Sequence, residues 1–484
     1  MYLGIDVGTS SVKTVLMDQG QRLLASASEP LTVDRPQPGW SEQNPDDWWR
    51  AAQSTIDRLA ADHAGQVSAV RGIGLSGQMH GATLLDKADR ILRPAILWND
   101  GRCGAECAEL DSAADFRGIG GNLVMPGFTA PKLAWVSHHQ PELFARVAKV
   151  LLPKDYVRLA LTGDYVSDMS DAAGTLWLDV ARRDWSDALL AATGLDRDKM
   201  PVLVEGSEVS GRLRPTLCQR WNMGAPPVVA GGGGDNAAAA CGVGVLPTGS
   251  AFVSLGTSGV LFVANERFSP NTQGAVHAFC HAAPGLWHQM GVILSATDSL
   301  EWLAGVTGTG VSELMAELEA SPPTAEGPVF LPYLSGERTP HNDPAARGAF
   351  AGLTRVHTRR DLTQSVLEGV AFAFGDCRAA LADAGTDFEC AYAVGGGARS
   401  VHWLRILASV LERPLLLPRD GDFGAAFGAA RLGLCAADGA DPLVVCAPPE
   451  IDREVRPEPA LRDRYSERYA RFRALYPALK ETMP

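Results

Sequence analysis

The sequence lacks the features that mark membrane and secreted proteins. It has no apolar run approaching the roughly 18 residues that a membrane-spanning helix needs. Its first residues lead directly into a strand-like apolar segment, without the basic stretch and long apolar core of a signal peptide. We therefore expect no membrane partner and a cytoplasmic location.

Paired cysteines and an excess of positive charge are also missing. The nine cysteines are scattered and odd in number, which is typical of a protein from a reducing compartment. Cys103 and Cys107 are four positions apart, but no second ligand pair is near, so an ordinary helical pair is favoured over a metal site. The net charge of −13 argues against a nucleic-acid partner. It does not exclude a phosphate ligand, because backbone N–H groups bind phosphate without a basic surface.

What the sequence does contain is a repeat of one short pattern. The segment I-D-V-G-T-S-S-V-K-T-V spans Ile5–Val15, and V-S-L-G-T-S-G-V-L-F-V spans Val253–Val263. Each is an apolar run, a Gly-Thr-Ser turn and a second apolar run, which predicts a hairpin whose turn offers N–H groups to an anion. One such hairpin is common, but two in matching contexts predict a duplicated fold with two loops facing one ligand.

A second repeated pattern supports the duplication. Four glycines precede Asp235 and an Ala-rich segment, and Asp422 precedes a similar segment later. Close packing of two such small-residue helices suits a contact between lobes. At 484 residues, two large domains are expected, which we divide as residues 1–246 and 247–484. The longer first half is expected to carry an insertion between about Asn99 and Arg212, a source of substrate specificity.

Alternating apolar runs and helical patterns predict an α/β fold. We expect helices over Asp46–Leu59 and Asp361–Ala380, and buried strands over Val67–Ser76, Pro227–Ala230 and Tyr392–Val394.

Together these elements resemble the actin-like (ribonuclease H-like) ATPase fold, and more narrowly the FGGY carbohydrate kinases. F-T-A-P-K-L-A-W-V (Phe128–Val136) and G-A-F-A-G-L (from Gly348), followed by D-L-T-Q-S-V-L-E, resemble the signatures of that family. The segments that resemble its pentulose kinases are G-Q-M-H-G-A-T, I-L-W-N-D-G-R, L-L-P-K-D-Y, S-D-M-S-D-A-A-G-T, G-G-G-D-N and Y-L-S-G-E-R-T-P-H. The resemblance implies two duplicated actin-like domains with a cleft between them, and ATP and Mg²⁺ as cofactors.

Two aspartates are the candidate catalytic residues. From the residues alone, Asp235 is equally a helix N-cap or a functional carboxylate at a strand end. The resemblance implies that it is the catalytic base. Asp6 lies on a buried strand, where a carboxylate needs a partner or a cation, although it could also bind its own turn. A Mg²⁺ site at Asp6 fits the preference of this ion for one carboxylate plus nucleotide phosphates.

The remaining candidates bind the nucleotide or the sugar. Thr9 and Ser10 in the first turn, and Gly256 and Thr257 in the second, offer donors for phosphates. The Lys13 side chain could reach a phosphate, or it could equally point into solvent from the second strand of the hairpin. Further candidates follow from the resemblance: Gly396 and Gly397 for the adenosine, with Arg399 beside them, and Met79, His80 and Asn236 for the sugar, with Trp98 and Asp100 as secondary candidates.

The resemblance implies ATP-dependent phosphorylation of a ketopentose, D-xylulose first, with ribulose or glycerol as alternatives. Glycerol kinases have Arg-Glu where this chain has Met79-His80, which argues against glycerol. An actin-like filament or chaperone-type ATPase is the rival of a different class, but no additional peptide-binding module is visible. The number of subunits is left open, with a homodimer as one option.

Overall fold

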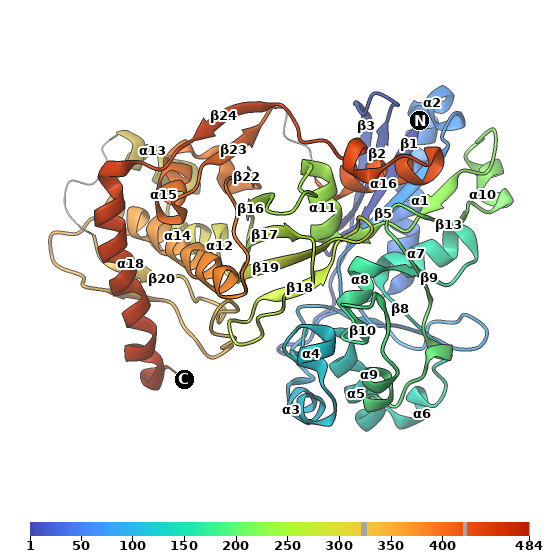
Figure 1. Cartoon of the computed structure of the whole chain (residues 1–484), viewed down its shortest axis with the longest axis horizontal. Coiled ribbons are helices and arrows are strands. Elements are labelled where there is room, and N and C mark those ends of the chain that lie inside the picture. The colour runs from blue at the N-terminus through green and yellow to red at the C-terminus, as the bar shows by residue number, and fades with distance from the viewer. Residues whose placement is uncertain (321–326, 420–423, 484) are drawn as a thin grey trace.

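Two large β-sheets carry the two halves of the chain (Figure 1). The computed structural model describes residues 1–320, 327–419 and 424–483. Within these residues the first sheet has seven strands, six in the order β13-β14-β5-β1-β2-β3 and β15 beside β5. Its strands are β1 (Tyr2–Val7), β2 (Ser11–Met17), β3 (Leu23–Pro30), β5 (Gly72–Gly77), β13 (Val209–Arg212), β14 (Val228–Ala230) and β15 (Gly233–Gly234).

The second sheet repeats the plan of the first. Its order is β18-β19-β17-β16-β22-β23-β24 within the described residues. In both sheets the first strand of the half pairs antiparallel with the next strand and parallel with a later one: β1 with β2 and β5, and β16 with β17 and β22. This common order confirms the predicted duplication. The strands are β16 (Ala251–Leu255), β17 (Gly259–Asn265), β18 (His277–Cys280), β19 (Trp287–Ile293), β22 (Ala391–Val394), β23 (Leu415–Pro418) and β24 (Ile451–Val455).

Smaller elements complete the two lobes. The described part of the chain also contains five two-stranded sheets: β4 (Glu42–Gln43) with β7 (Ala95–Ile96), β6 (Thr83–Leu85) with β8 (Lys149–Leu151), β9 (Val166–Asp168) with β12 (Val202–Val204), β10 (Leu178–Asp179) with β11 (Asp184–Trp185), and β20 (Val329–Leu331) with β21 (Ala349–Ala351). The helices of the first half are α1 (Pro45–Asp62), α2 (Ala64–Ser68), α3 (Gly104–Ala113), α4 (Phe116–Gly120), α5 (Thr129–His139), α6 (Pro141–Phe144), α7 (Pro153–Thr162), α8 (Met169–Ala173), α9 (Asp187–Ala192), η1 (Arg197–Lys199), α10 (Pro215–Arg220) and α11 (Asp235–Val243). Those of the second half are α12 (Thr297–Thr307), α13 (Val311–Ala320), α14 (Arg359–Asp383), η2 (Gly396–Arg399), α15 (Val401–Leu411), α16 (Ala425–Asp438), α17 (Pro442–Val445), α18 (Pro459–Leu479) and η3 (Lys480–Thr482).

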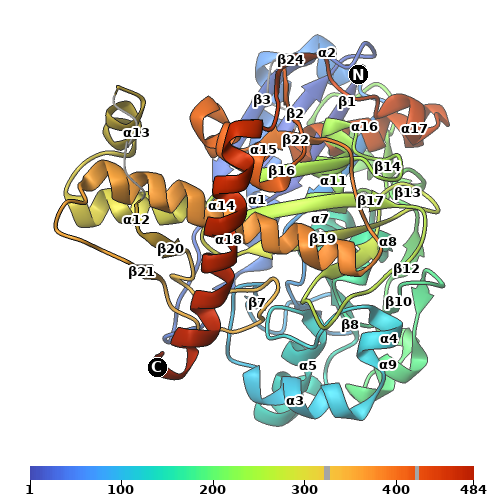
Figure 2. The ribbon, with the colours of Figure 1, turned by 60° about the vertical axis from the view of Figure 1, so that its left-hand side comes forward.

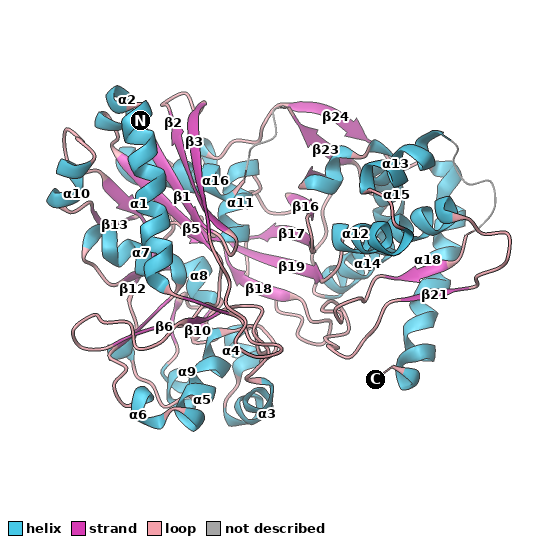
Figure 3. Ribbon diagram, turned by 180° about the vertical axis from the view of Figure 1, so that it is seen from behind, coloured by secondary structure: helices cyan, strands magenta, loops and turns pink. Residues whose placement is uncertain are grey.

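The two faces of β1 have different partners. Leu3, Ile5 and Val7 lie in one apolar cluster with α1, which covers this face of the sheet (Figure 3). The alternate residues face α16: a Cβ added to Gly4 would lie 1.9 Å from the Ala426 carbonyl oxygen. Because strand side chains alternate between faces, Asp6 lies on the α16 side, where the two lobes meet.

Helices α11 and α16 cross with their backbones in contact. A Cβ added to Gly428 of α16 would lie 1.7 Å from the Ala238 carbonyl oxygen of α11. Figure 1 shows α16, from the C-terminal part of the chain, beside the blue strands of the first sheet. The expected contact between two small-residue helices is therefore confirmed. The preceding Asp422 lies outside the described residues.

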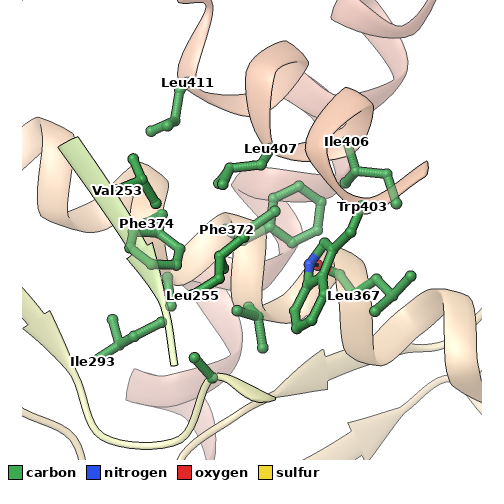
Figure 4. Packing of buried hydrophobic residues seen from close by; sticks show 14 of the residues in the cluster. Val253, Leu255, Ile293, Leu367, Phe372, Phe374, Trp403, Ile406, Leu407 and Leu411 are labelled. Atoms are coloured by element: carbon green, nitrogen blue, oxygen red, sulfur yellow. Dashed lines mark hydrogen bonds between the residues drawn. The ribbon is translucent and has the colours of Figure 1, made fainter. Parts of the chain in front are cut away.

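The core of the second lobe lies between its sheet and helices α14 and α15 (Figure 4). Val253 and Leu255 of β16 contribute from the sheet, and Phe374 and Leu407 contribute from the helices. Trp403 is 1% exposed and donates its indole N–H to the Leu367 carbonyl at 3.1 Å, which fixes α15 against α14. Helix α18 packs on the outside of this lobe (Figure 2).

Most of the expected elements are found. The helices predicted at Asp46–Leu59 and Asp361–Ala380 are the cores of α1 and α14, and the strands at Pro227–Ala230 and Tyr392–Val394 are β14 and β22. The strand predicted over Val67–Ser76 is wrong in its first part, because α2 ends at Ser68 and β5 begins only at Gly72. No helix in the described ranges is long and apolar enough to cross a membrane.

Candidate active site

Asp235 lies where three strand ends of the first sheet converge. Gly233 and Gly234 pair with Ser76 and Gly77 of β5, and Asp6 of β1 pairs with Ser76 from the other side. Asp235 then opens α11, so its side chain is placed at the edge that these strand ends share. Its position is the first helical residue, because Gly234 is the N-cap. The N-cap interpretation of Asp235 is therefore wrong.

The carboxylate of Asp235 is oriented by the residue that follows it. Its Oδ1 accepts hydrogen bonds from the Asn236 backbone N–H at 2.6 Å and from Asn236 Nδ2 at 2.9 Å. Burial raises the pKa of Asp235, which these two hydrogen bonds oppose. Its Oδ2 accepts no hydrogen bond from the described residues and is available to a ligand.

Asp6 faces the same space as Asp235. Its Oδ1 is buried without a hydrogen-bond partner among the described residues. Burial and then the neighbouring Asp235 carboxylate raise the pKa of Asp6 to about 6. An unpaired buried carboxylate oxygen beside a second carboxylate fits a hard divalent cation. Groups of three or more metal-binding side chains are not found in the described residues, so such an ion would depend on Asp6 and on phosphate oxygens.

A buried ionic cluster supports the glycine loop behind Asp235. Arg158 donates to the carbonyl oxygens of Ala230 and Gly231, and Ser170 Oγ accepts the Gly234 N–H at 3.0 Å. Three aspartates surround the ammonium of Lys154 at 2.5, 2.8 and 3.3 Å, and all of these side chains are fully buried: Asp155, Asp168 and Asp171. The loop is thus fixed by charged groups that water does not reach.

Met79 and His80 form one wall of the site beside Asp235. A Cβ added to Gly234 would lie 2.9 Å from Met79 Cγ and Sδ, so the Met79 side chain is packed against the residue before Asp235. His80 is left-handed, with φ of 70°, and its Nδ1 lies 2.6 Å from the Gly174 carbonyl oxygen. Lys132 braces this backbone by donating to the His80 carbonyl oxygen at 2.7 Å. The two predicted sugar-binding residues therefore lie together with the predicted base.

The first Gly-Thr-Ser turn is tied to this wall. The Thr9 hydroxyl donates to Gln78 Oε1 at 2.9 Å and accepts the Trp98 indole N–H at 3.0 Å. Its hydroxyl is thus already used, and its backbone N–H is the group that remains for a phosphate. Ser10, at the tip of the turn, is exposed. Asp100 is buried in an ion pair with Arg102 and accepts the Ser41 N–H, so it has a structural role.

The second turn faces the start of α12. The carbonyl oxygens of Gly256 and Thr257 accept the backbone N–H groups of Thr297 and Ala296 at 2.9 and 2.8 Å. Thr257 is exposed at the tip of this turn, as Ser10 is in the first. Each turn therefore exposes one residue at its tip, the third residue of the Gly-Thr-Ser pattern in the first turn and the second residue in the second turn.

A cavity of about 770 Å³ lies between α11 and the strands β16, β22 and β23 of the second sheet. Its size suits a nucleotide-sized ligand. Gly396 lines it, and a Cβ there would meet nothing within 4 Å, whereas Gly397 is buried against Leu255 and Trp403. Gly396 is thus placed to approach a ligand, and Gly397 has a packing role. The cavity is lined by Ala239, Val243, Phe252, Ser254, Ala393, Val394, Gly395, Gly396, Ala398, Arg399, Leu417, Pro418 and Gly424.

Several residues of the site carried no assigned role in the sequence interpretation. Lys132 and Ser170 lie in segments that resemble the family, and so does Arg338 in Y-L-S-G-E-R-T-P-H. These segments were the sequence feature that could have identified the three residues. Their positions relative to His80 and Asp235, however, depend on contacts between residues far apart in the chain. Cys103 and Cys107 are an ordinary helical pair, since Cys107 Sγ donates to the Cys103 carbonyl oxygen.

Two lobes with the same strand order, a nucleotide-sized cavity and a carboxylate at the convergence of strand ends are the arrangement of the actin-like ATPase fold, which includes two-lobed sugar kinases. The chain belongs to the FGGY family of carbohydrate kinases: residues 1–242 match its N-terminal domain and residues 251–437 match its C-terminal domain. As a family member it uses ATP.

Individual relatives cover the whole chain. It is 49% identical over 486 residues to the xylulose kinase of Escherichia coli (strain K12), covering 100% of both chains. It is 50% identical over 487 residues to the xylulose kinase of Klebsiella pneumoniae, again covering 100% of both. The crystal structure of a xyloylose kinase from Brucella ovis matches with a TM-score of 0.97 and 57% identity over 99% of each chain.

Proposed function

We propose that this protein transfers the γ-phosphoryl group of ATP to the terminal hydroxyl of D-xylulose, giving D-xylulose 5-phosphate. The product would feed the pentose phosphate pathway during D-xylose catabolism. The observation that supports the proposal is the position of Asp235, which directly follows the residue packed against Met79 and whose carboxylate is near enough to Asp6 to raise the pKa of that carboxyl. The names of the full-length relatives support D-xylulose as the sugar.

Asp235 would accept the proton of the attacking hydroxyl. Asn236 holds Oδ1, so Oδ2 is the oxygen that can face the sugar. Burial raises the pKa of Asp235, which makes its ionised form a stronger proton acceptor. Met79 would pack on the carbon chain, and His80 would bind a hydroxyl.

Asp6 would hold Mg²⁺ on the opposite side of the reacting groups. This ion, when bound, supplies neutralisation of phosphate charge. The N–H groups of Thr9, Ser10, Gly256 and Thr257 would bind phosphate oxygens, and Gly396 would lie against the adenosine. Closure of the lobes would exclude water as a competing acceptor. We further propose that residues 1–246 bind the sugar and hold the catalytic base, and that residues 247–484 bind the nucleotide. The protein would act in the cytoplasm, with a homodimer as its assembly.

The test is Asp235→Asn, assayed by ADP release with D-xylulose. Loss of the proton acceptor should lower kcat by about 10³-fold or more, while Kd for D-xylulose changes by less than about tenfold. Asp187→Asn is the matched control, because Asp187 also begins a helix, α9, but lies away from the site. A kcat for Asp235→Asn within about tenfold of the wild type would refute the assignment.

A further inference from the structure

Arg338 is fixed at the end of the second sheet and directed toward the first lobe. Its neighbour Glu337 accepts the Leu294 N–H through Oε1 at 3.0 Å, and Thr339 Oγ1 accepts the Val292 N–H at 3.0 Å. These two anchors hold the backbone on both sides of Arg338. The side chain that projects between them is therefore preorganised.

The guanidinium of Arg338 has one hydrogen-bond partner within the described residues. Its Nη1 lies 3.2 Å from His277 Nε2, and His277 Nδ1 lies 3.0 Å from Asn122 Oδ1. Because Arg338 donates, Nε2 is an acceptor and Nδ1 carries the hydrogen. Burial, followed by the charge of Arg338, holds the pKa of His277 well below its usual value, so His277 is neutral. The other N–H groups of Arg338 are left for a ligand.

Arg338 belongs to the same cluster as the sugar-site histidine. The Phe128 ring lies between His80 and His277, with centroid distances of 4.7 and 5.6 Å. Burial lowers the pKa of His80 to about 3, and the charges of Lys132 and Arg338 add to this effect. Arg338 is thus near enough to His80 for its charge to lower the pKa of that ring, and both side chains contact the Phe128–His277 group.

His80 presents an acceptor to this same space. Its Nδ1 lies 2.6 Å from the Gly174 carbonyl oxygen, which accepts, so Nδ1 carries the hydrogen. With a pKa of about 3 the ring is neutral, and Nε2 keeps its lone pair. Nε2 has no hydrogen-bond partner among the described residues, and it is not one of the fully buried polar atoms without a partner, so a ligand can reach it. This part of the site therefore combines a donor-only group with an acceptor.

We propose that Arg338 determines selectivity for a ketose by donating hydrogen bonds to its C2 carbonyl oxygen, while His80 Nε2 accepts a neighbouring hydroxyl. This inference rests on the proposed function, with the terminal hydroxyl at Asp235. A carbonyl oxygen only accepts, which matches a guanidinium that only donates. The C2 hydroxyl of a polyol can also accept from Arg338, but its hydrogen then needs an acceptor of its own, and His80 Nε2 is already used by the neighbouring hydroxyl, which disfavours binding.

The test compares D-xylulose with xylitol and D-arabitol, the two alcohols formed by reducing its C2. Arg338→Gln should lower kcat/KM for D-xylulose by about 10- to 100-fold, the effect expected for a charged hydrogen bond. It should lower kcat/KM for the two alcohols by less than about threefold, so that ketose selectivity collapses. KM for ATP should not change. The control is Arg355→Gln, an exposed arginine of the same lobe, which should change none of these values.

Arg338→Lys retains the charge without the planar fork and should give an intermediate loss of selectivity. An equal loss for ketose and alcohols, or no loss at all, would overturn the assignment of Arg338. If the wild type instead prefers D-ribulose, the proposed function is wrong, and the loss of selectivity between D-ribulose and ribitol in Arg338→Gln then decides the role of Arg338.

Discussion

Two carboxylates at one edge of the first sheet, Asp6 and Asp235, are the residues to which we assign the proposed chemistry. The sequence pattern predicted both of them, since Asp6 precedes the first turn and Asp235 follows four glycines. The pattern could not predict their immediate partners. The Asn236 amide is bound to Asp235, and the Thr9 hydroxyl is bound to Gln78 and Trp98. Such contacts depend on side-chain positions that periodicity does not encode.

The raised pKa of Asp6 predicts a pH-dependent stability. Between about pH 4 and 6 the folded state binds more protons at Asp6 than the unfolded state, so its contribution to stability falls as pH rises. Above pH 6 the charged carboxylate costs on the order of 3 kcal/mol. Asp6→Asn stays neutral, so without metal it should unfold at a higher temperature than the wild type at pH 8. This difference should vanish near pH 4.

Asp18→Asn provides a control of opposite sign. The Arg22 backbone N–H holds the pKa of Asp18 below its usual value, so ionised Asp18 stabilises the fold above pH 4. Asp18→Asn should therefore melt at a lower temperature than the wild type at pH 8. Melting curves across pH 4–8 measure both variants. A lower melting temperature for Asp6→Asn at pH 8 would contradict the account.

At the scale of elements, local patterns predicted most of what their own residues determine. Both Gly-Thr-Ser hairpins and helices α1 and α14 follow from alternation, helical periodicity and start signals. The region Val67–Ser76 was predicted wrongly because Val67 and Val70 are buried by a short helix and turn before β5 begins at Gly72. A short apolar run does not distinguish these two ways of burying a side chain.

The crossing of α11 and α16 requires glycine at its closest point. In Gly428→Ala the new methyl group would overlap the Ala238 carbonyl oxygen, so the helices must separate. We expect the melting temperature to fall by several degrees, because overpacking of this kind costs about 1–3 kcal/mol. Activity should fall as well, since α11 begins at Asp235.

Gly305→Ala in α12 is the matched control for this crossing. Gly305 is exposed, and a Cβ there meets nothing within 4 Å. Replacing a helical glycine by alanine at such a site should stabilise the protein by up to about 1 kcal/mol. Calorimetric melting of both variants decides the point. An unchanged melting temperature for Gly428→Ala would show that the helices tolerate separation.

At the scale of the whole molecule, the two halves of the sequence depend on each other. Helix α16 comes from the second half but covers the face of the first sheet that contains Gly4, Gly72 and Gly74. The Arg338 guanidinium likewise reaches from the second lobe toward His80. Neither contact follows from a local pattern, because each joins segments hundreds of residues apart. The duplication and the contact between α11 and α16 were therefore predictable, whereas the packing of α16 on the first sheet and the approach of Arg338 to His80 were not.

Because α16 of the second half covers the first sheet, we predict that residues 1–246 do not fold alone. Without α16, one face of the first sheet would be exposed to water. The isolated fragment should show no cooperative melting, and adding residues 247–484 as a separate chain should restore it. Circular dichroism during heating measures both. A cooperative transition in the fragment alone would contradict the structural dependence of the halves.

The central claim is that this site phosphorylates D-xylulose at the expense of ATP. The most direct measurement is kcat/KM for ATP-dependent ADP release over D-xylulose, D-ribulose and glycerol. The account predicts the highest value for D-xylulose, with the phosphate on its C5 oxygen. A higher value for D-ribulose or glycerol, or ATP hydrolysis that does not depend on any sugar, would contradict it.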